Sequence, residues 1–315
     1  MSHAVVTGAA GFIGSHVCEA MLARGWRITG VDSFDSFYDP QRKRRNVAGL
    51  VGQEGFALVE ADIRDATAMD RVIGGGADAI VHLAARAGVR PSIENPLLYN
   101  DVNVQGTGVL LEAARKFSVP KFVFASSSSV YGNNPKVPFS EDDRVDNPIS
   151  PYAATKKAGE LICHTYHHLY GLNVSCLRFF TVYGPRQRPD LAIHKFARLI
   201  EDERPIPFFG DGSMMRDHTY IDDIVAGVVA SVEQCGGYKI YNLGNSSPVS
   251  LADLVAGIEA ALGKKALIER LGTQPGDVER TYADVSRARA ELGYEPRTDL
   301  KTGLARFVAW LRQEG

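Results

Sequence analysis

Short apolar runs alternate with amphipathic stretches along the first two-thirds of the chain. Six runs have the length of strands and are rich in apolar residues, at positions 4–6, 28–31, 57–59, 79–83, 121–125 and 173–177. Strands that are apolar on both faces are typical of a parallel sheet covered by helices on each side. Helical spacing of apolar residues falls between these runs, at 12–24, 98–117 and 153–170. The alternation predicts an α/β protein with a Rossmann-type, doubly wound parallel sheet and right-handed connections.

The pattern changes after Thr181. Loops with Pro and Gly surround helical patterns near 191–203, 222–234, 250–262 and 299–313. We interpret this part as a second, smaller mixed α/β domain. The expected domains are therefore residues 1–180 and residues 181–315, with a segment near 215–245 folding back to join the first domain.

Charge and composition narrow the range of partners. The chain holds 35 Lys+Arg against 37 Asp+Glu, so it lacks the basic excess that drives binding to nucleic acid. No apolar run approaches the roughly 20 residues that span a bilayer. The four cysteines are far apart in sequence, without the paired spacing of a metal site or a disulfide framework. We expect a cytoplasmic protein with no nucleic-acid or membrane partner, no metal site, and most cysteines in the core.

A glycine-rich turn follows the first predicted strand. Gly8, Gly11 and Gly14 are spaced three residues apart and open the helical stretch at 12–24. Gly8 permits a tight turn, Gly11 lets backbone N–H groups approach a pyrophosphate, and Gly14 lets helix and strand pack closely. The positive end of the helix dipole then faces the phosphates. The turn predicts a dinucleotide site.

Acidic residues at the ends of the next two strands extend this prediction. Asp32 lies 18 residues after Gly14, where a carboxylate can bind the adenosine ribose and would repel a 2′-phosphate, which favours NAD over NADP. The basic run at 42–45 could meet a phosphate, but a solvated helix face is the favoured interpretation. Asp62 and Ile63 follow the third strand, where either an adenine contact or a helix N-cap at Asp62 fits the sequence.

Tyr152 and Lys156 are four residues apart, so on a helix they share one face. We expect the Lys156 ammonium to lower the pKa of the Tyr152 phenol from about 10. A phenolate can take a proton from a sugar hydroxyl while a hydride leaves the same carbon. The run Ser126–Ser129 follows the strand at 121–125, at the edge where such sheets bind ligands. An isolated Tyr-x-x-x-Lys is often only a surface pair, and this context favours catalysis.

In combination these motifs resemble the extended short-chain dehydrogenase/reductase family. The match covers nearly the whole chain and includes the turn at 8–14, His82-Leu83-Ala84-Ala85, Ser126–Gly132, Tyr152-x-x-x-Lys156 and Arg216-Asp217-x-x-Tyr220. Within the family the chain is most similar to the nucleotide-sugar epimerases, and among these to the UDP-glucuronate 4-epimerases. The closer likeness rests on Ala87-Gly88-Val89-Arg90, Ser126–Gly132, and Leu177–Pro185 running into Arg188-Pro189-Asp190.

The resemblance implies NAD as cofactor and a UDP-sugar as substrate, bound by the second domain. It makes Tyr152 the base, Ser127 the hydroxyl relay and Lys156 the residue that holds the nicotinamide ribose. The implied cofactor residues are Gly8, Gly11, Phe12, Ile13, Gly14, Asp32, Asp62, Ile63, Leu83, Ala84, Ala85, Tyr152 and Lys156. The implied substrate residues are Ser128, Ser129 and Thr181 toward a carboxylate, Arg188 toward the nucleotide, Arg216 toward the diphosphate, Asp277 toward the uridine ribose, and Arg90.

The implied reaction is C4 epimerisation of UDP-glucuronate to UDP-galacturonate through a 4-keto intermediate. Glucose-type 4-epimerases usually carry Asn where Thr181 stands, so UDP-glucose or a UDP-N-acetylhexosamine is the alternative substrate. A 4,6-dehydratase usually has an Asp-Glu pair where Ser128 and Ser129 stand, and here that acid/base partner is missing. A catalytically silent nucleotide-binding scaffold is disfavoured by the intact Ser127, Tyr152 and Lys156. The resemblance also implies a homodimer joined by a four-helix bundle of the helices at 98–117 and 153–170.

Overall fold

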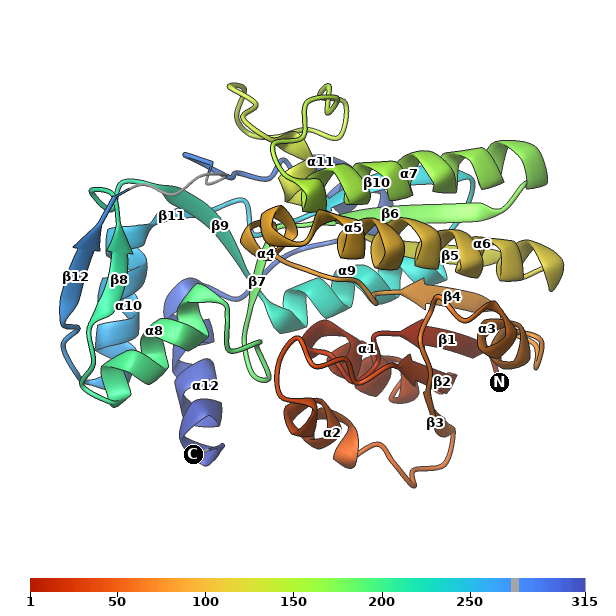
Figure 1. Ribbon diagram of the computed structural model, residues 1–315, viewed down its shortest axis with the longest axis horizontal. Helices are drawn as coiled ribbons and strands as arrows, with labels where there is room; N and C mark the ends of the chain where they lie inside the picture. Colours follow the sequence, from red (N-terminus) through yellow and green to blue (C-terminus); the bar gives the residue numbers. More distant parts are fainter. Residues whose placement is uncertain (273–277, 315) are drawn as a thin grey trace.

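A seven-stranded sheet organises the larger part of the molecule (Figure 1). The computed structural model describes residues 1–272 and 278–314. The strand order is β10-β6-β5-β4-β1-β2-β3, and every neighbouring pair is parallel. All six apolar runs lie in this sheet, which confirms the Rossmann-type architecture. Its strands are β1 (His3–Thr7), β2 (Arg27–Asp32), β3 (Phe56–Glu60), β4 (Ala79–His82), β5 (Lys121–Ser127), β6 (Asn173–Phe179) and β10 (Tyr238–Leu243).

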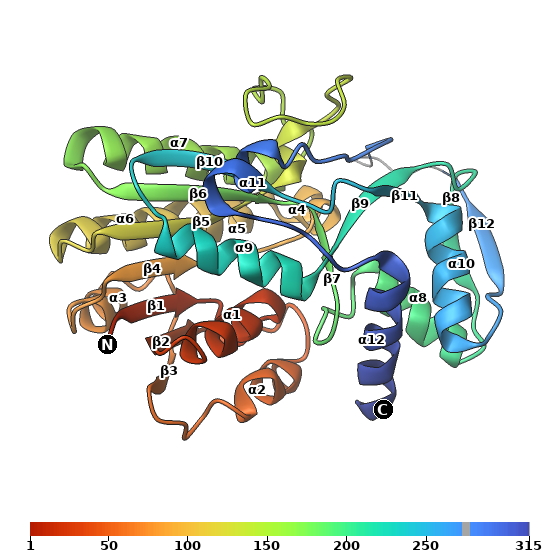
Figure 2. The same ribbon diagram turned by 180° about the vertical axis from the view of Figure 1, so that it is seen from behind.

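Helices cover both faces of this sheet (Figures 1 and 2). One face carries α3 (Ala66–Ile73), α6 (Gly106–Lys116) and α7 (Pro151–Tyr170), and the other carries α1 (Phe12–Leu22), α9 (Ile221–Glu233) and α11 (Ser286–Leu292). Val5 and Val6 are adjacent and both fully buried, yet they belong to different apolar clusters, one on each side of the sheet. This explains why the strands are apolar without alternation.

The chain leaves the large sheet after β6 and returns to it. Helix α9 packs against α1, and β10 pairs with β6 at the sheet edge, with Tyr238 opposite Val174. Between β6 and α9 the chain forms β7 (Thr181–Tyr183) and β9 (Met215–Tyr220). These two strands and β11 (Pro248–Ser250) make a separate sheet of order β11-β9-β7. Helix α11 also packs against α9 and β10, so the larger part of the molecule is built from three separated stretches of sequence.

The smaller lobe packs beside the carboxyl ends of the large sheet's strands. It holds β8 (Ile206–Phe209) parallel to β12 (Ile268–Leu271), and β11 (Pro248–Ser250) antiparallel to β9. Three helices pack with these short sheets, and the sequence patterns place them within two residues of their observed bounds. They are α8 (Ala192–Glu201), α10 (Leu251–Leu262) and α12 (Leu300–Gln313).

The stretch 98–117 differs from the single helix expected from its apolar spacing. It follows α4 (Val89–Glu94) and consists of α5 (Pro96–Tyr99), a π-helix (Asn100–Gln105) and α6. In the π-helix, Asn103 is buried and binds both backbone groups of Arg86, accepting from its N–H (2.8 Å) and donating to its carbonyl (3.0 Å). This long-range contact accompanies the altered helical turn, and local spacing does not encode it.

Two further features bear on the setting of the protein. Among the described residues, no helix is both long and apolar enough to cross a membrane. Cys18, Cys163, Cys176 and Cys235 are free thiols and all are buried, which confirms the expected core role. Burial raises the pKa of the Cys18 thiol well above its usual value, so this thiol is held in its unreactive form.

Candidate functional site

A cavity of about 520 Å³ lies where the strand order reverses between β1 and β4. Doubly wound sheets bind ligands at such a point. The predicted residues that line it are Gly8, Gly11, Phe12, Ile13, Gly14, Asp32, Asp62, Ile63, Leu83, Ala84, Ala85, Ser127, Ser128, Ser129, Tyr152, Lys156, Thr181, Arg188 and Arg216. Arg90 is not in the lining, and its guanidinium lies 4.9 Å from the centre of the Phe209 ring. Asp277 lies outside the described residues.

The glycine turn packs backbone against backbone. Gly8 has a left-handed conformation with a φ of 70°, and a Cβ there would come within 2.8 Å of the Ala84 nitrogen. A Cβ on Gly14 would lie 2.0 Å from the Gly8 carbonyl oxygen. Gly11 is the N-cap of α1 and places no side chain before the first turn, whose residues line the cavity. The turn therefore has the open helix N-terminus that binds phosphate.

Asp32 ends β2 at the other side of the turn. Its side chain is 6% exposed and accepts hydrogen bonds from the N–H groups of Ala10 (3.1 Å) and Phe34 (2.8 Å). Burial raises the pKa of this carboxyl. The nearby charge of Lys43 and the two N–H groups lower the same pKa, but by less than burial raises it. A carboxylate fixed in this way beside the cavity is a built acceptor for ribose hydroxyls.

The basic run at 42–45 is not a uniformly solvated face. Lys43 is 8% exposed, lines the cavity, and places Nζ 3.9 Å from Asp32 Oδ1. Helix α2 (Pro40–Ala48) turns Lys43 and the buried Val47 inward because they are four residues apart. The solvated-face interpretation is therefore wrong for Lys43. Arg44 pairs instead with Glu60 at the surface.

Asp62 does not cap the following helix. The N-cap of α3 is Asp65, whose Oδ1 accepts from the Ala68 N–H (3.0 Å). Asp62 instead accepts from the guanidinium of Arg64 (2.6 Å at Oδ2) and lines the cavity beside the buried Ile63. The N-cap interpretation is wrong because the helix begins one turn later, and contact with an adenine ring remains a prediction.

Helix α7 brings the tyrosine and the lysine to the cavity. Ser150 caps the helix by accepting from the Ala153 N–H (3.1 Å), and Pro151 occupies the first helical position, so Tyr152 lies in the first turn. One turn later, Lys156 is 4% exposed and donates from Nζ to the Ala125 carbonyl (2.7 Å). Its Nζ lies 5.9 Å from the centre of the Tyr152 ring.

The pKa of Tyr152 lies above its usual value, opposite to the direction expected from Lys156. Burial of the phenol raises its pKa, while a hydrogen bond from Ser127 and the charge of Arg188 lower it. Burial also lowers the pKa of Lys156 to about 7. The expectation was wrong because it left out the loss of water around both groups, which is the largest contribution for each.

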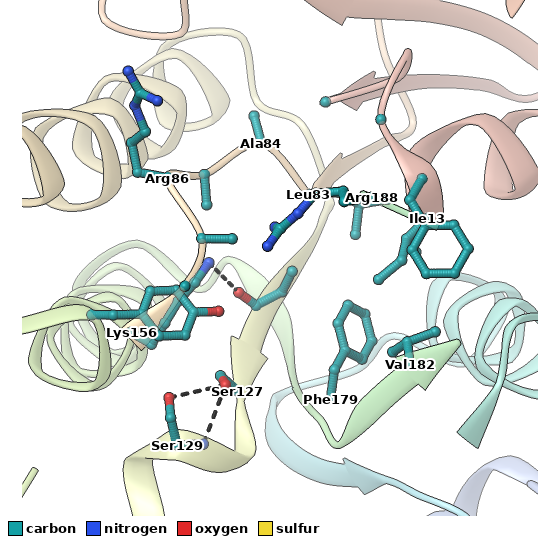
Figure 3. A pocket seen from close by; sticks show the side chains of 18 of the residues that line it. Ile13, Leu83, Ala84, Arg86, Ser127, Ser129, Lys156, Phe179, Val182 and Arg188 are labelled. Carbon is teal, nitrogen blue, oxygen red and sulfur yellow. Dashed lines mark hydrogen bonds between the residues drawn. The ribbon is translucent and has the colours of Figure 1, made fainter. Parts of the chain in front are cut away.

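Hydroxyl groups gather at the end of β5 (Figure 3). Ser127 Oγ accepts from the N–H (3.2 Å) and the hydroxyl (2.9 Å) of Ser129, which lies with Ser128 in a short 3₁₀ turn, Ser128–Tyr131. Thr181 begins β7 and Arg216 lies on β9, so these two lining residues come from the smaller lobe. The serine run and the smaller lobe thus contribute polar groups to the same cavity.

The model of the NAD-dependent epimerase/dehydratase family matches residues 4–244. The chain belongs to this family. A UDP-glucuronate 4-epimerase of Thermodesulfobacterium geofontis is 46% identical over 316 residues, covering 99% of this chain and 97% of that one. The crystal structure of UDP-glucuronic acid 4-epimerase from Bacillus cereus with UDP-glucuronic acid and NAD has a TM-score of 0.94 at 37% identity, covering 99% of this chain and 100% of that one. UDP-glucose 4-epimerase from Thermotoga maritima with UDP-glucose has a TM-score of 0.91 at 31% identity, covering 99% of each chain.

The cavity also contains Asp35, Phe37 and Arg86, which the motifs did not predict and which lie close to the predicted Arg188. The guanidinium groups of Arg86 and Arg188 each lie 5.4 Å from the centre of the Phe37 ring. Arg86 pairs with Asp35 (3.0 Å), and Arg188 binds Asp190 through Nε (3.0 Å). Figure 3 shows Arg188 extending among the residues that line the pocket. The cluster of acidic and aromatic residues directly after Asp32 was the available signal.

Proposed function

We propose that the chain is an NAD-dependent UDP-sugar 4-epimerase that interconverts UDP-glucuronate and UDP-galacturonate through a 4-keto intermediate. The observation that carries the proposal is that Tyr152, Ser127 and Lys156 line the same cavity as the glycine turn. A base, a hydroxyl relay and an ammonium beside a dinucleotide site are what reversible oxidation of a sugar carbon requires. Two of the relatives are named as epimerases of UDP-glucuronate, which supports this substrate.

The residues present fit NAD. The Gly8–Gly14 turn and the N-terminus of α1 would hold the pyrophosphate. The close backbone contact that shapes this turn requires glycine at position 14, because a side chain there would clash with the Gly8 carbonyl. Asp32 would hold the adenosine ribose, and Lys156 the nicotinamide ribose. When bound, NAD⁺ supplies the hydride acceptor and, once reduced, the hydride donor.

Tyr152 would move the proton. As phenolate, it would take the proton of the C4 hydroxyl while the hydrogen on C4 leaves as hydride, so that C4 becomes a ketone, and the phenol would return a proton when the ketone is reduced. Ser127 and Arg188 both favour the phenolate, since each lowers the pKa of the phenol. Rotation of the sugar about its diphosphate linkage presents the other face of the ring before reduction, which inverts C4.

The serine end of the cavity suits a uronate. The 4-keto form of a uronate is a β-keto acid, which can lose CO₂ unless its carboxylate is held in an unfavourable orientation. The hydroxyls of Ser128, Ser129 and Thr181 would hold it by neutral hydrogen bonds. The described carboxylates in the lining are Asp32, Asp35 and Asp62. Asp32 ends a strand three positions from β5, roughly 14 Å away at about 4.8 Å per strand, so it cannot serve as a dehydratase acid at the sugar.

The test is incubation of purified protein with UDP-glucuronate, UDP-glucose or a UDP-N-acetylhexosamine, without added NAD, followed by separation of products. We expect UDP-glucuronate to reach a mixture with UDP-galacturonate, because the cofactor is regenerated in each cycle. Conversion of UDP-glucose alone would replace the proposed substrate. A dehydrated 4-keto-6-deoxy product would replace the reaction, and no turnover of any nucleotide sugar would favour a silent scaffold.

We also propose a homodimer joined through α6 and α7 as a four-helix bundle. Leu161, Leu169 and Tyr170 of α7 are each more than half exposed, which is unusual for large apolar side chains on one helix. Light scattering coupled to gel filtration tests this, with a mass of one chain as the contrary result. The free, buried cysteines support a reducing, cytoplasmic setting, which cell fractionation tests.

A further inference from the structure

Two buried charges lie next to the catalytic face and have no part in the chemistry proposed above. Glu160 on α7 is 0% exposed and Arg178 on β6 is 1% exposed. Arg178 donates from Nε to Glu160 Oε1 (2.9 Å) and from Nη2 to Oε2 (2.9 Å). Two parallel charge-assisted hydrogen bonds fix both distance and orientation between a helix and a strand.

The pair is connected to the elements that carry the site. Ser126, directly before Ser127, donates its hydroxyl to Glu160 Oε1 (2.6 Å). Arg178 Nη1 donates to the Tyr131 hydroxyl (2.9 Å), and Tyr131 ends the 3₁₀ turn that carries the other serines. The Tyr131 hydroxyl donates in turn to Asn242 on β10 (2.7 Å). Helix α7 and strands β5, β6 and β10 therefore meet at one ion pair.

The contact between α7 and β5 indicates what this ion pair does in the structure. Tyr152, Lys156 and Glu160 are four residues apart and share one face of α7. Gly159 lies so close to β5 that a Cβ there would come 2.3 Å from Cζ of Phe124. The Phe124 ring fills the space over Gly159, so at this point α7 itself contributes no side chain that would fix its position along the strand. Directional bonds, from Lys156 to Ala125 and from Ser126 to Glu160, supply that restraint.

Stability alone does not account for the pair. Exchanging a buried ion pair for apolar residues of similar volume is often neutral or stabilising, because both charges lose their hydration. Both charges are nonetheless fully buried, and each guanidinium nitrogen and carboxylate oxygen of the pair is hydrogen-bonded. The fixed distance and orientation that the pair imposes between α7 and β6 explain it better.

We propose that Glu160 and Arg178 are positioning residues that fix α7 along β5 and thereby hold the Tyr152 phenol in hydrogen-bonding range of Ser127. The inference rests on the proposed epimerase function, in which Tyr152 moves the proton. A displacement of about 1 Å at a reacting group can lower a rate by about 10²-fold, so a small slip of α7 is sufficient to matter.

Ser126→Ala is the decisive variant, because it removes one bond to Glu160 and leaves the ion pair and Ser127 in place. We expect kcat to fall by about tenfold with KM for the sugar and bound NAD unchanged. The acid limb of the kcat–pH profile should move to higher pH, since the Ser127 hydrogen bond lowers the pKa of Tyr152. The other titratable or charged groups that face Tyr152 are Lys156, Arg188 and Tyr99, and the variant changes none of them.

Glu160→Gln should lower kcat further, by about 10²-fold, with the same shift of the pH profile. It leaves Arg178 without its counter-charge, which can unfold the protein. Glu160→Gln/Arg178→Met removes both charges and avoids this, so the loss of positioning can be measured in folded protein. Glu291→Gln is the matched control. Glu291 pairs with Lys239 (3.0 Å) and accepts from Tyr241 (2.9 Å) at the surface, and its loss should leave the pH profile unchanged.

A coupling measurement completes the test. In a Ser127→Ala background the Ser126→Ala change should cost no further activity, because the contact that it supports is already gone. A folded Ser126→Ala protein with the unaltered pH profile, or a full tenfold further loss in the double variant, overturns the positioning role while the epimerase activity stands. Absence of turnover by the unaltered protein would instead overturn the proposed function itself.

Discussion

The two ends of the cavity, which we propose bind the cofactor and the sugar, differ in the chemical groups that line them. At the cofactor end the chain approaches itself backbone to backbone, as where Gly14 meets the Gly8 carbonyl, and the fixed groups are N–H groups and one buried carboxylate. At the sugar end the groups are hydroxyls and guanidiniums such as Ser128, Thr181 and Arg216, drawn from both lobes. A methyl group added at one of these glycines should therefore abolish cofactor binding. At the other end, replacement of a single side chain should change only the preference for one sugar over another.

Gly14→Ala should have the largest effect. Its Cβ would lie 2.0 Å from the Gly8 carbonyl oxygen, so the turn must open and we expect complete loss of bound NAD or failure to fold. The nucleotide released on denaturation is the measurement. Gly49→Ala is the control, because Gly49 has a φ of −72° and a Cβ there meets nothing within 4 Å. Full NAD retention in Gly14→Ala would contradict the backbone character of this end.

Tyr152→Phe should lower kcat by about 10²–10⁴-fold, the range for loss of a general base, with NAD still bound. Steady-state turnover of UDP-glucuronate measures it. Tyr99→Phe is the comparison, because Tyr99 packs edge-on against the Tyr152 ring and donates to the Ala87 carbonyl (2.7 Å). Losing that single bond should cost about 1 kcal/mol of stability and less than tenfold in rate. Equal losses in both variants would remove Tyr152 from its assigned role.

Lys156→Met separates catalysis from stability in protein stripped of NAD. The pKa of Lys156 is about 7 in the folded chain against 10.5 for the free group, so folding releases its proton between these pH values. The unfolded state then binds more protons, and the free energy of unfolding from this group rises with pH across that window. The variant should lose activity, be no less stable at pH 7, and lack this slope. Urea unfolding at pH 7, 8 and 9 measures the slope, and an unchanged slope would contradict the burial argument.

Thr181→Val should have the smallest effect and the most selective one. Removing one hydroxyl that holds the carboxylate should lower kcat/KM for UDP-glucuronate about fivefold, equivalent to about 1 kcal/mol, with any turnover of UDP-glucose unchanged. Thr67→Val, at an exposed position of α3, serves as the control. A uniform loss on both sugars would mean that Thr181 supports the strand and not the carboxylate.

The sequence predicted best what local spacing encodes. The glycine turn, the Tyr152–Lys156 face and the six apolar runs each depend on residues within one turn or strand. Lys43 was misjudged because its burial depends on the phase of α2 against α1. Asp62 was misjudged because α3 begins one turn later, at Asp65, and Asp62 binds Arg64 instead. The π-helix at Asn103 depends on the backbone of Arg86, 17 residues away. The direction in which the pKa of Tyr152 is shifted depends on the burial of the phenol, and a sequence motif does not show how deeply a side chain is buried.

The return of the chain to the large sheet limits how such a protein can diversify. Because α9 and β10 follow the first strands of the smaller lobe, no single stretch of gene encodes the smaller lobe alone. A crossover that replaced everything after Thr181 would also exchange β10, an outer strand of the large sheet, and would separate it from its original pairing partners on β6. New sugar preferences are therefore expected to arise by replacement of individual pocket residues, and laboratory libraries should vary those positions in place instead of recombining halves.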